Sequence, residues 1–307
     1  MYDLIILGGG PAGLTAALYA GRYGLNFVVI SKDIGGMANY AAKVENFPNF
    51  IGSGIELTQG MKKQAEKFGA VISLDEVIDV QKKGEEFIVK SQKKEYKSKS
   101  LIIALGTKRK KLNVIGEERL AGKGVSYCAT CDGFFFKDKI IAVVGGRDSC
   151  ANTSLMLADI CKKVYLIYRG KELKCINVYQ KQIMGNKKIE KIFNAVPIEV
   201  KGKEKVESLV YEQGGGDKDK TQESEIKIDG LFFEIGSLPS TSSLDKLKLK
   251  KDKEGWLIVN EEMETNISGV YACGDVTKHS LKQIITACSQ GAVAVKSVNE
   301  YLKKFGD

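Results

Sequence analysis

Histidine is almost absent from the 307-residue sequence, and long apolar runs are missing altogether. His279 is the single histidine, which leaves few ligands for a zinc site built from clustered cysteine and histidine side chains. No run of eighteen or more apolar residues occurs, so we expect no membrane-spanning helix. The N-terminus, MYDLIILGGG, enters an apolar strand directly and lacks the basic region of a signal peptide. These absences predict a cytoplasmic protein.

The composition predicts a globular chain, since 43% hydrophobic residues over this length suffice for two domains with their own cores. Lysines produce most of the net charge of +9, but they alternate with acidic residues and are not interleaved with aromatic ones. This pattern favours a solvated surface over a nucleic-acid-binding face. The run TKRKK, residues 107–111, is purely basic and would suit an acidic protein partner near an active site.

Two segments show the order strand, Gly-rich turn, helix, strand: residues 3–31 and residues 139–170. Such βαβ units predict two nucleotide-binding lobes, each with a doubly wound parallel sheet. Short β-rich stretches lead into apolar strands that end at Gly106 and Gly236, and the polar stretch 214–224 is expected to be a hairpin loop. The last segment reads as a strand, a Gly-Asp turn and a long amphipathic helix.

The first Gly-rich turn, LGGGPAG, matches the dinucleotide fingerprint at Gly8, Gly10 and Gly13. These glycines allow a tight turn, close approach of a pyrophosphate and close packing of the helix on the strand. The acidic residue expected near the end of the second strand is not obvious, because that strand ends at Ser31 and offers only Asp33.

The sequence YCATCDG places Cys128 and Cys131 in a C-x-x-C motif followed by Asp132. A zinc clip would have to recruit Cys150, Cys161 or Cys175 from other elements. Seven cysteines at irregular spacings do not resemble a secreted disulfide framework, and a permanent disulfide is not typical of a reducing compartment. We therefore favour a redox pair, for which an adjacent carboxyl group can move protons.

The sequence resembles the low-molecular-weight, FAD-containing thioredoxin reductases. The matching stretches run in order from Leu4 to Gly291 and include ILGGGPAGLTAALYAGR, VENFP, LIIALGT, GVSYCATCDGFFF, IAVVGG, GLFFEIGSLPS and GVYACGDV. The resemblance implies an α/β fold with two Rossmann-like lobes, each a parallel sheet with a small antiparallel β-meander. The FAD lobe is discontinuous, 1–112 and 239–307, and the lobe that carries the C-x-x-C motif, 113–238, is inserted into it.

The resemblance also implies an FAD site. Its expected residues are Gly8, Gly10, Pro11, Ala12, Gly13, Gly35, Gly36, Asn46, Gly106, Asp275, Lys282, Gln283 and Ile284. Two positions depart from the family, because Met37 replaces a glutamine and Lys282 replaces an arginine.

By the same resemblance, Cys131 faces the flavin, Cys128 exchanges with the disulfide of thioredoxin or a thioredoxin-like protein, and Asp132 is the acid. One short turn cannot contact a flavin and a second protein at once, so the lobe must move, with hinges expected at 112–117 and 236–240. The family precedent further implies a homodimer.

The second Gly-rich turn departs from the pattern expected for NADPH. It reads Gly145, Gly146, Arg147, Asp148 and Ser149, followed by Cys150, with arginine where a glycine should admit the pyrophosphate. Of the family's phosphate clamp only Arg169 is unchanged, since Tyr168, Gly170 and Lys174 occupy the other positions. Lysine binds phosphate as a point charge and lacks the two parallel hydrogen bonds of arginine. NADPH and a different donor, ferredoxin or a deazaflavin, therefore stay equal alternatives. A flavin reductase of the ferredoxin reductase type and a redox sensor or zinc-clipped module without turnover are the rival functions.

Overall fold

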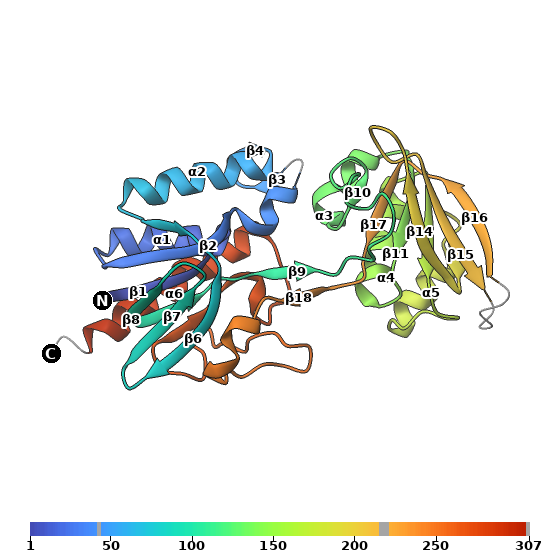
Figure 1. Cartoon of the computed structure of the whole chain (residues 1–307). Helices are drawn as coiled ribbons and strands as arrows, with labels where there is room; N and C mark the ends of the chain where they lie inside the picture. Colours follow the sequence, from blue (N-terminus) through green and yellow to red (C-terminus); the bar gives the residue numbers. More distant parts are fainter. Residues whose placement is uncertain (42–43, 215–220, 305–307) are drawn as a thin grey trace. The chain divides into compact units, whose positions relative to one another are not determined.

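The chain divides into two compact units in the computed structural model, which describes residues 1–41, 44–214 and 221–304 (Figure 1). Unit 1 comprises Met1–Lys108 and Leu238–Asp307, and unit 2 is Arg109–Ser237. The segment 112–117, expected to be a hinge, lies within unit 2, where Ile115 forms a bridge with Glu199. The strands that link the units, β9 (Thr107–Arg109) and β18 (Ser237–Pro239), pair with each other.

Unit 1 is built on a seven-stranded sheet with β1 at its centre. The parallel strands are β5 (Ile72–Leu74), β2 (Phe27–Ile34), β1 (Tyr2–Gly9), β8 (Glu95–Ile103) and β19 (Val270–Ala272). A meander of β6 (Val77–Lys83) and β7 (Glu86–Ser91) joins β8 in antiparallel pairing. β1 is buried on both faces from Leu4 to Leu7, which explains its unbroken apolar sequence.

Helices of unit 1 cover this sheet. They are α1 (Pro11–Arg22), α2 (Gly54–Lys67) and α6 (Ile284–Lys303), with 3-10 turns η1 (Gly36–Tyr40), η3 (Ser242–Leu247) and η4 (Gly274–Val276) and the hairpin β3 (Val44–Phe47) and β4 (Phe50–Gly52). α1 and α6 pack closely, because a Cβ on Gly291 would overlap the carbonyl of Ala12. Ser53 and Glu56 form a capping box that begins α2.

Unit 2 contains a five-stranded parallel sheet and a three-stranded antiparallel sheet. The parallel strands, in spatial order, are β10 (Val125–Ser126), β17 (Gly230–Phe233), β11 (Ile140–Val144), β12 (Lys163–Tyr168) and β13 (Ile189–Phe193). Its helical elements are α3 (Ala129–Asp132), η2 (Gly133–Phe136), α4 (Asp148–Ile160) and α5 (Asn177–Gly185). The antiparallel strands are β14 (Ala195–Lys201), β15 (Ser208–Gly214) and β16 (Thr221–Lys227).

The predicted α/β fold with two Rossmann-like lobes is confirmed. Each unit combines a parallel βαβ sheet with an antiparallel meander, as the sequence indicated. The loop predicted at 214–224 is shorter than expected, because Gly214 already pairs with Thr221 across the hairpin; residues 215–220 lie outside the described part. Among the described residues, no helix combines the length and the apolar character that a membrane span requires.

Candidate redox and dinucleotide-binding sites

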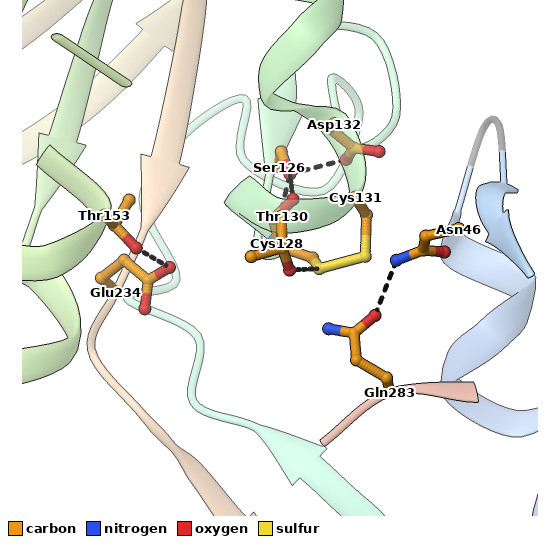
Figure 2. Close-up of a disulfide and its surroundings, with 9 residues drawn as sticks. All are labelled: Asn46, Ser126, Cys128, Thr130, Cys131, Asp132, Thr153, Glu234 and Gln283. Atoms are coloured by element: carbon orange, nitrogen blue, oxygen red, sulfur yellow. Dashed lines mark hydrogen bonds between the residues drawn. A yellow bond between two sulfur atoms is a disulfide. The ribbon is translucent and has the colours of Figure 1, made fainter. Parts of the chain in front are cut away.

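Cys128 and Cys131 form a disulfide within a single turn of unit 2, with their Cα atoms 5.3 Å apart (Figure 2). Cys128 is the N-cap of α3, and its carbonyl accepts hydrogen bonds from the backbone N–H groups of Cys131 at 3.2 Å and Asp132 at 3.0 Å. Both cysteines are half-buried. The disulfide is therefore held by local backbone geometry and remains accessible from solution.

Ser126 connects the acid to this turn. Its hydroxyl donates a hydrogen bond to Asp132 Oδ2 at 2.6 Å and accepts one from the backbone N–H of Cys128 at 3.1 Å (Figure 2). Thr130 places its hydroxyl 3.4 Å from Cys128 Sγ. Ser126 is buried, whereas Thr130 is exposed. The sequence analysis did not predict a role for either hydroxyl. The only signal in the sequence was their position, since Ser126 lies two residues before Cys128 and Thr130 lies between the two cysteines.

The other five cysteines are buried and free. Burial raises the pKa of Cys150 to about 12 and that of Cys161 to about 11. No group of three or more histidine, cysteine or acidic residues in the described part of the chain is arranged to hold a metal. The C-x-x-C pair therefore has no further zinc ligands beside it within those residues.

The first Gly-rich turn has the geometry of a phosphate-binding turn. A side chain at Gly8, where φ is +110°, would overlap the Ala104 backbone, and one at Gly13 would overlap the Gly8 carbonyl. At Gly10, the N-cap of α1, the nearest atom to a built Cβ is the Gly35 carbonyl oxygen at 3.9 Å. The packing of the protein thus demands glycine at Gly8 and Gly13. At Gly10 it leaves open space at a helix N-terminus, where phosphates bind.

Ser31 and Asp33, near the end of β2, organise the next loop of unit 1. The backbone N–H of Gly9 donates to Ser31 Oγ at 2.8 Å, and that hydroxyl donates to the Asp33 carbonyl at 2.6 Å. Asp33 Oδ1 accepts a hydrogen bond from the Gly36 N–H at 3.0 Å. Gly35 and Gly36 both have positive φ, +95° and +53°, which explains the glycine pair. Asp33 therefore supports this loop.

Two residues expected near a flavin are brought together from distant segments. Asn46, in β3, donates its side-chain amide to Gln283 Oε1 at 2.9 Å (Figure 2). Gln283 is the N-cap of α6, and Ile284 is the first residue of that helix. Gly106 has a φ of +61°, and no atom lies within 4 Å of a Cβ built on it.

Asp275 lies in η4, directly after β19. Burial raises the pKa of its carboxyl group, and nearby Lys282 counteracts this. Lys282 donates to the backbone carbonyls of Asp275 at 2.6 Å and Thr277 at 3.1 Å, and its Nζ lies 3.5 Å from the centre of the Trp256 ring. Since no described side chain or N–H group donates a hydrogen bond to the Asp275 carboxylate, this acceptor is available to a ligand hydroxyl.

The second Gly-rich turn begins α4, and Arg147 is its N-cap. Gly145 has a φ of +155°, and a Cβ there would lie 2.5 Å from the Glu234 carbonyl oxygen. Asp148 and Ser149 follow in the first turn of α4, while Arg169 and Lys174 are exposed.

Glu234 is a residue that sequence reasoning missed. It follows β17, and its carboxylate accepts a hydrogen bond from Ser149 Oγ at 2.5 Å. It accepts a second one from Thr153 Oγ1 at 3.0 Å (Figure 2). Burial raises its pKa, and the two hydroxyls oppose that shift. The signal was an acidic residue at the end of the apolar stretch GLFFEIG.

Comparison with known proteins agrees with this geometry. The profile of the pyridine nucleotide-disulphide oxidoreductases matches residues 2–291. The thioredoxin reductase of Bacillus subtilis is 38% identical over 309 residues, which cover 99% of this chain and 96% of that protein. The Treponema pallidum thioredoxin reductase is 38% identical, covering 98% and 97%. The crystal structure of thioredoxin reductase from Streptococcus pyogenes superposes with a TM-score of 0.93 at 37% identity, covering 99% of both chains.

The chain belongs to the thioredoxin reductase family.

Membership of the thioredoxin reductases implies an FAD and a pyridine nucleotide. The residues of unit 1 fit the FAD. The space at Gly10 admits a pyrophosphate at the start of α1, and the Asp275 carboxylate can accept a ribityl hydroxyl. Lys282 does not replace the family's arginine as a free cation, because it is held by two carbonyls and the Trp256 ring.

Proposed function

We propose that this chain is a thioredoxin-disulfide reductase that carries FAD in unit 1 and passes electrons through Cys128 and Cys131 to thioredoxin or a thioredoxin-like protein. The observation that carries the proposal is the half-buried disulfide in a single turn, hydrogen-bonded at Cys128 and flanked by Asp132. The relatives that cover the whole chain are named thioredoxin reductases.

The bound FAD would supply an electron pair. Reduction of the Cys128–Cys131 disulfide breaks the S–S bond and consumes two electrons and two protons, and Asp132, held by Ser126, is placed to move a proton at this turn. The Cys128 thiolate then attacks the disulfide of thioredoxin and releases one of its thiolates. Attack by Cys131 on the mixed disulfide releases reduced thioredoxin and restores the original disulfide.

A protein substrate suits the surface next to the disulfide. Phe134 and Phe135 follow the redox motif in η2, with 72% and 42% of their surfaces exposed. Exposed aromatic side chains are typical of protein-binding surfaces. A flavin reductase of the ferredoxin reductase type would have no use for the C-x-x-C pair, and a sensor without turnover would not need the acid beside it.

The assignment of roles includes the two units. Unit 1 would hold FAD and unit 2 would carry the disulfide, so unit 2 must alternate between a position that meets the flavin and one that meets thioredoxin. We place this hinge in the connecting segments, β9 and residues 236–240, where the chain passes between the compact units.

The finer parts of the proposal concern the donor and the setting. Of NADPH, ferredoxin and a deazaflavin, we favour an acidic reduced ferredoxin. Lys108, Lys110 and Lys111 are exposed in the basic run 107–111, although Lys111 pairs with Glu118 at 3.2 Å. Complementary charge would accelerate such an encounter. We further propose a cytoplasmic homodimer.

The test reduces the FAD-loaded protein with dithionite, which makes the natural donor unnecessary. Excess dithionite is removed anaerobically, and oxidised thioredoxin is added. We expect one thioredoxin disulfide to be reduced per two-electron-reduced chain, as measured by thiol labelling and mass spectrometry. A reduced protein that leaves thioredoxin oxidised would contradict the proposed function whatever its donor.

A further inference from the structure

The two Gly-rich turns of the chain are equivalent, since each joins the first strand of a βαβ unit to its helix. Gly10 and Arg147 occupy the same place as N-caps with similar backbone angles, φ −77° and ψ −176° for Gly10, φ −108° and ψ −175° for Arg147. Gly10 leaves open space where a pyrophosphate approaches the backbone, and in unit 2 the same position bears an arginine side chain.

The charge at the two helix N-termini also differs. α1 has no acidic residue in its first turn, whereas α4 begins with Asp148. Glu234, which follows β17, adds a second carboxyl group at the C-terminal edge of the sheet, where ligands bind in such folds. Its carboxylate accepts hydrogen bonds from the hydroxyls of Ser149 and Thr153 in α4. Carboxylates at this end of a helix satisfy the dipole that would otherwise attract phosphate, and they repel a diphosphate.

The segment after β12 closes on the same turn. The backbone N–H of Lys174 donates to the Gly146 carbonyl at 2.7 Å, and that of Ile176 donates to Asp148 Oδ1 at 2.8 Å. The Tyr168 ring lies where a Cβ on Gly146 would be, and it also comes within 2.6 Å of the Cβ position on Gly170. Leu173 is buried in the core of unit 2 and anchors the segment there.

We infer that unit 2 retains the fold of a dinucleotide-binding domain but does not bind a pyridine dinucleotide. The residues at its Gly-rich turn do not fit the cofactor that the family implies. Arg147 stands at the position where Gly10 of unit 1 leaves open space, and Asp148 and Glu234 place carboxyl groups at the start of α4. The backbone N–H groups of Lys174 and Ile176 are hydrogen-bonded to Gly146 and Asp148 of the same turn. The inference rests on the proposed function in one respect, namely that electrons still reach the Cys128–Cys131 pair, but from another class of donor.

The effect on affinity is large. A phosphate loses its hydrogen bonds to the turn, and each charged hydrogen bond contributes about tenfold or more to binding, so two of them account for roughly a hundredfold. We therefore expect no saturable binding of NADP⁺ or NAD⁺ up to about 1 mM, against the micromolar range of a functional dinucleotide site.

The experiment uses the FAD-loaded wild-type protein. Calorimetric titration with NADP⁺ and NAD⁺ measures binding independently of turnover, and anaerobic addition of NADPH, NADH or dithionite is followed by bleaching of the flavin absorbance. We expect no binding of NADP⁺ or NAD⁺ and no bleaching of the flavin by NADPH or NADH. Dithionite should reduce the flavin, and the reduced protein should then reduce thioredoxin. Micromolar binding of NADP⁺ or NAD⁺, or rapid saturable bleaching by NADPH or NADH, would overturn the inference.

A pair of substitutions tests which side chains close the turn. The double variant Arg147→Gly, Glu234→Gln removes the arginine side chain from the turn and the half-buried carboxyl group beside it, and we expect NADP⁺ binding to tighten at least tenfold. The matched control is Glu190→Gln, which removes an exposed acid of the same unit that pairs with Lys163 at 2.6 Å, far along the chain from the turn. Tightening below threefold in the double variant, or equal tightening in the control, would refute the assignment to these two residues.

The dithionite arm separates the two proposals. If dithionite-reduced protein fails to reduce thioredoxin, the proposed function is wrong and the nucleotide result stands by itself. If it succeeds and NADPH also bleaches the flavin, the proposed function holds and the inference about unit 2 is wrong.

Discussion

The Ser126 hydroxyl donates a 2.6 Å hydrogen bond to Asp132 and accepts one from the backbone of Cys128, so a single side chain links the acid to the first cysteine. Ser126 ends β10 and is buried, whereas the disulfide begins on the next turn and is half-exposed. The carboxyl group of Asp132, which belongs to the redox turn, is thus hydrogen-bonded to the end of a strand in the sheet of unit 2.

This link makes Asp132 and Ser126 separable by mutation. Asp132→Asn should slow electron transfer into the disulfide by about a hundredfold, the typical effect of losing a general acid, with FAD content unchanged. Ser126→Ala should have a smaller effect and should shift the pH profile of the same step, because it removes the hydrogen bond that orients the acid but keeps the carboxyl group. Stopped-flow single-turnover measurements provide both. Asp159→Asn, an exposed acid on α4, is the control, and equal rates for Asp132→Asn and this control would exclude a role for Asp132.

The two cysteines should differ in their spectra. Cys128→Ser and Cys131→Ser should each abolish thioredoxin reduction and retain FAD. Only Cys128→Ser keeps the thiolate assigned to the flavin, so it should show a long-wavelength charge-transfer band that Cys131→Ser lacks. The opposite pattern would exchange the two roles.

Thiol alkylation should be selective. The five free cysteines are buried, and burial raises the pKa of Cys273, like that of Cys150, to about 12. Thiolates are the reactive species, so these groups should stay unmodified in the native protein. Mass spectrometry after iodoacetamide treatment should find no adduct on the oxidised chain and two on the reduced one, at Cys128 and Cys131. Adducts elsewhere under native conditions would show that a buried cysteine becomes accessible.

Because the space at Gly10 is open, a large side chain there should reduce FAD binding and leave the fold intact. Gly10→Arg gives unit 1 the residue that unit 2 has at this place, and we expect at least tenfold less FAD per purified chain, because the side chain enters the path of the pyrophosphate. Gly60→Arg is the control, since no atom lies within 4 Å of a Cβ at that exposed helical position. Circular dichroism should show both variants folded, and normal FAD content in Gly10→Arg would place the pyrophosphate elsewhere.

Glu234 should make stability depend on pH. Its folded-state pKa is raised above the ordinary 4.5 by burial, so the folded state favours the neutral acid. The associated stability is present below the ordinary pKa and is lost as pH rises through the folded pKa. The side chain that Glu234→Gln introduces cannot ionise, so the variant should match the wild type at about pH 4 and should have a larger free energy of unfolding than the wild type at about pH 8. Denaturant unfolding at the two pH values measures this, and a variant less stable than wild type at high pH would contradict it.

Local patterns in the sequence predicted most of the fold, because the strand–turn–helix order around Gly8 and around Gly145 is encoded within about thirty residues. The Cys128–Cys131 pair was predictable for the same reason, as both cysteines lie in one turn. Contacts between distant segments were not. The hydrogen bonds of Glu234 to Ser149 and Thr153, and of Lys174 to Gly146, depend on how β17 and the segment after β12 meet α4, and no local signal reports this. The contact of Lys282 with the Trp256 ring could not be predicted from the local sequence either.

β10 leads directly into the redox turn, and its hydrogen-bonded neighbour in the five-stranded sheet is β17, the strand that ends beside Glu234. The sheet of unit 2 therefore positions the disulfide, and this requirement holds whether or not unit 2 binds a nucleotide. A protein that changed its electron donor could change every side chain at the Gly-rich turn of unit 2. It could not lose unit 2 itself, because the strands of this unit position Cys128 and Cys131.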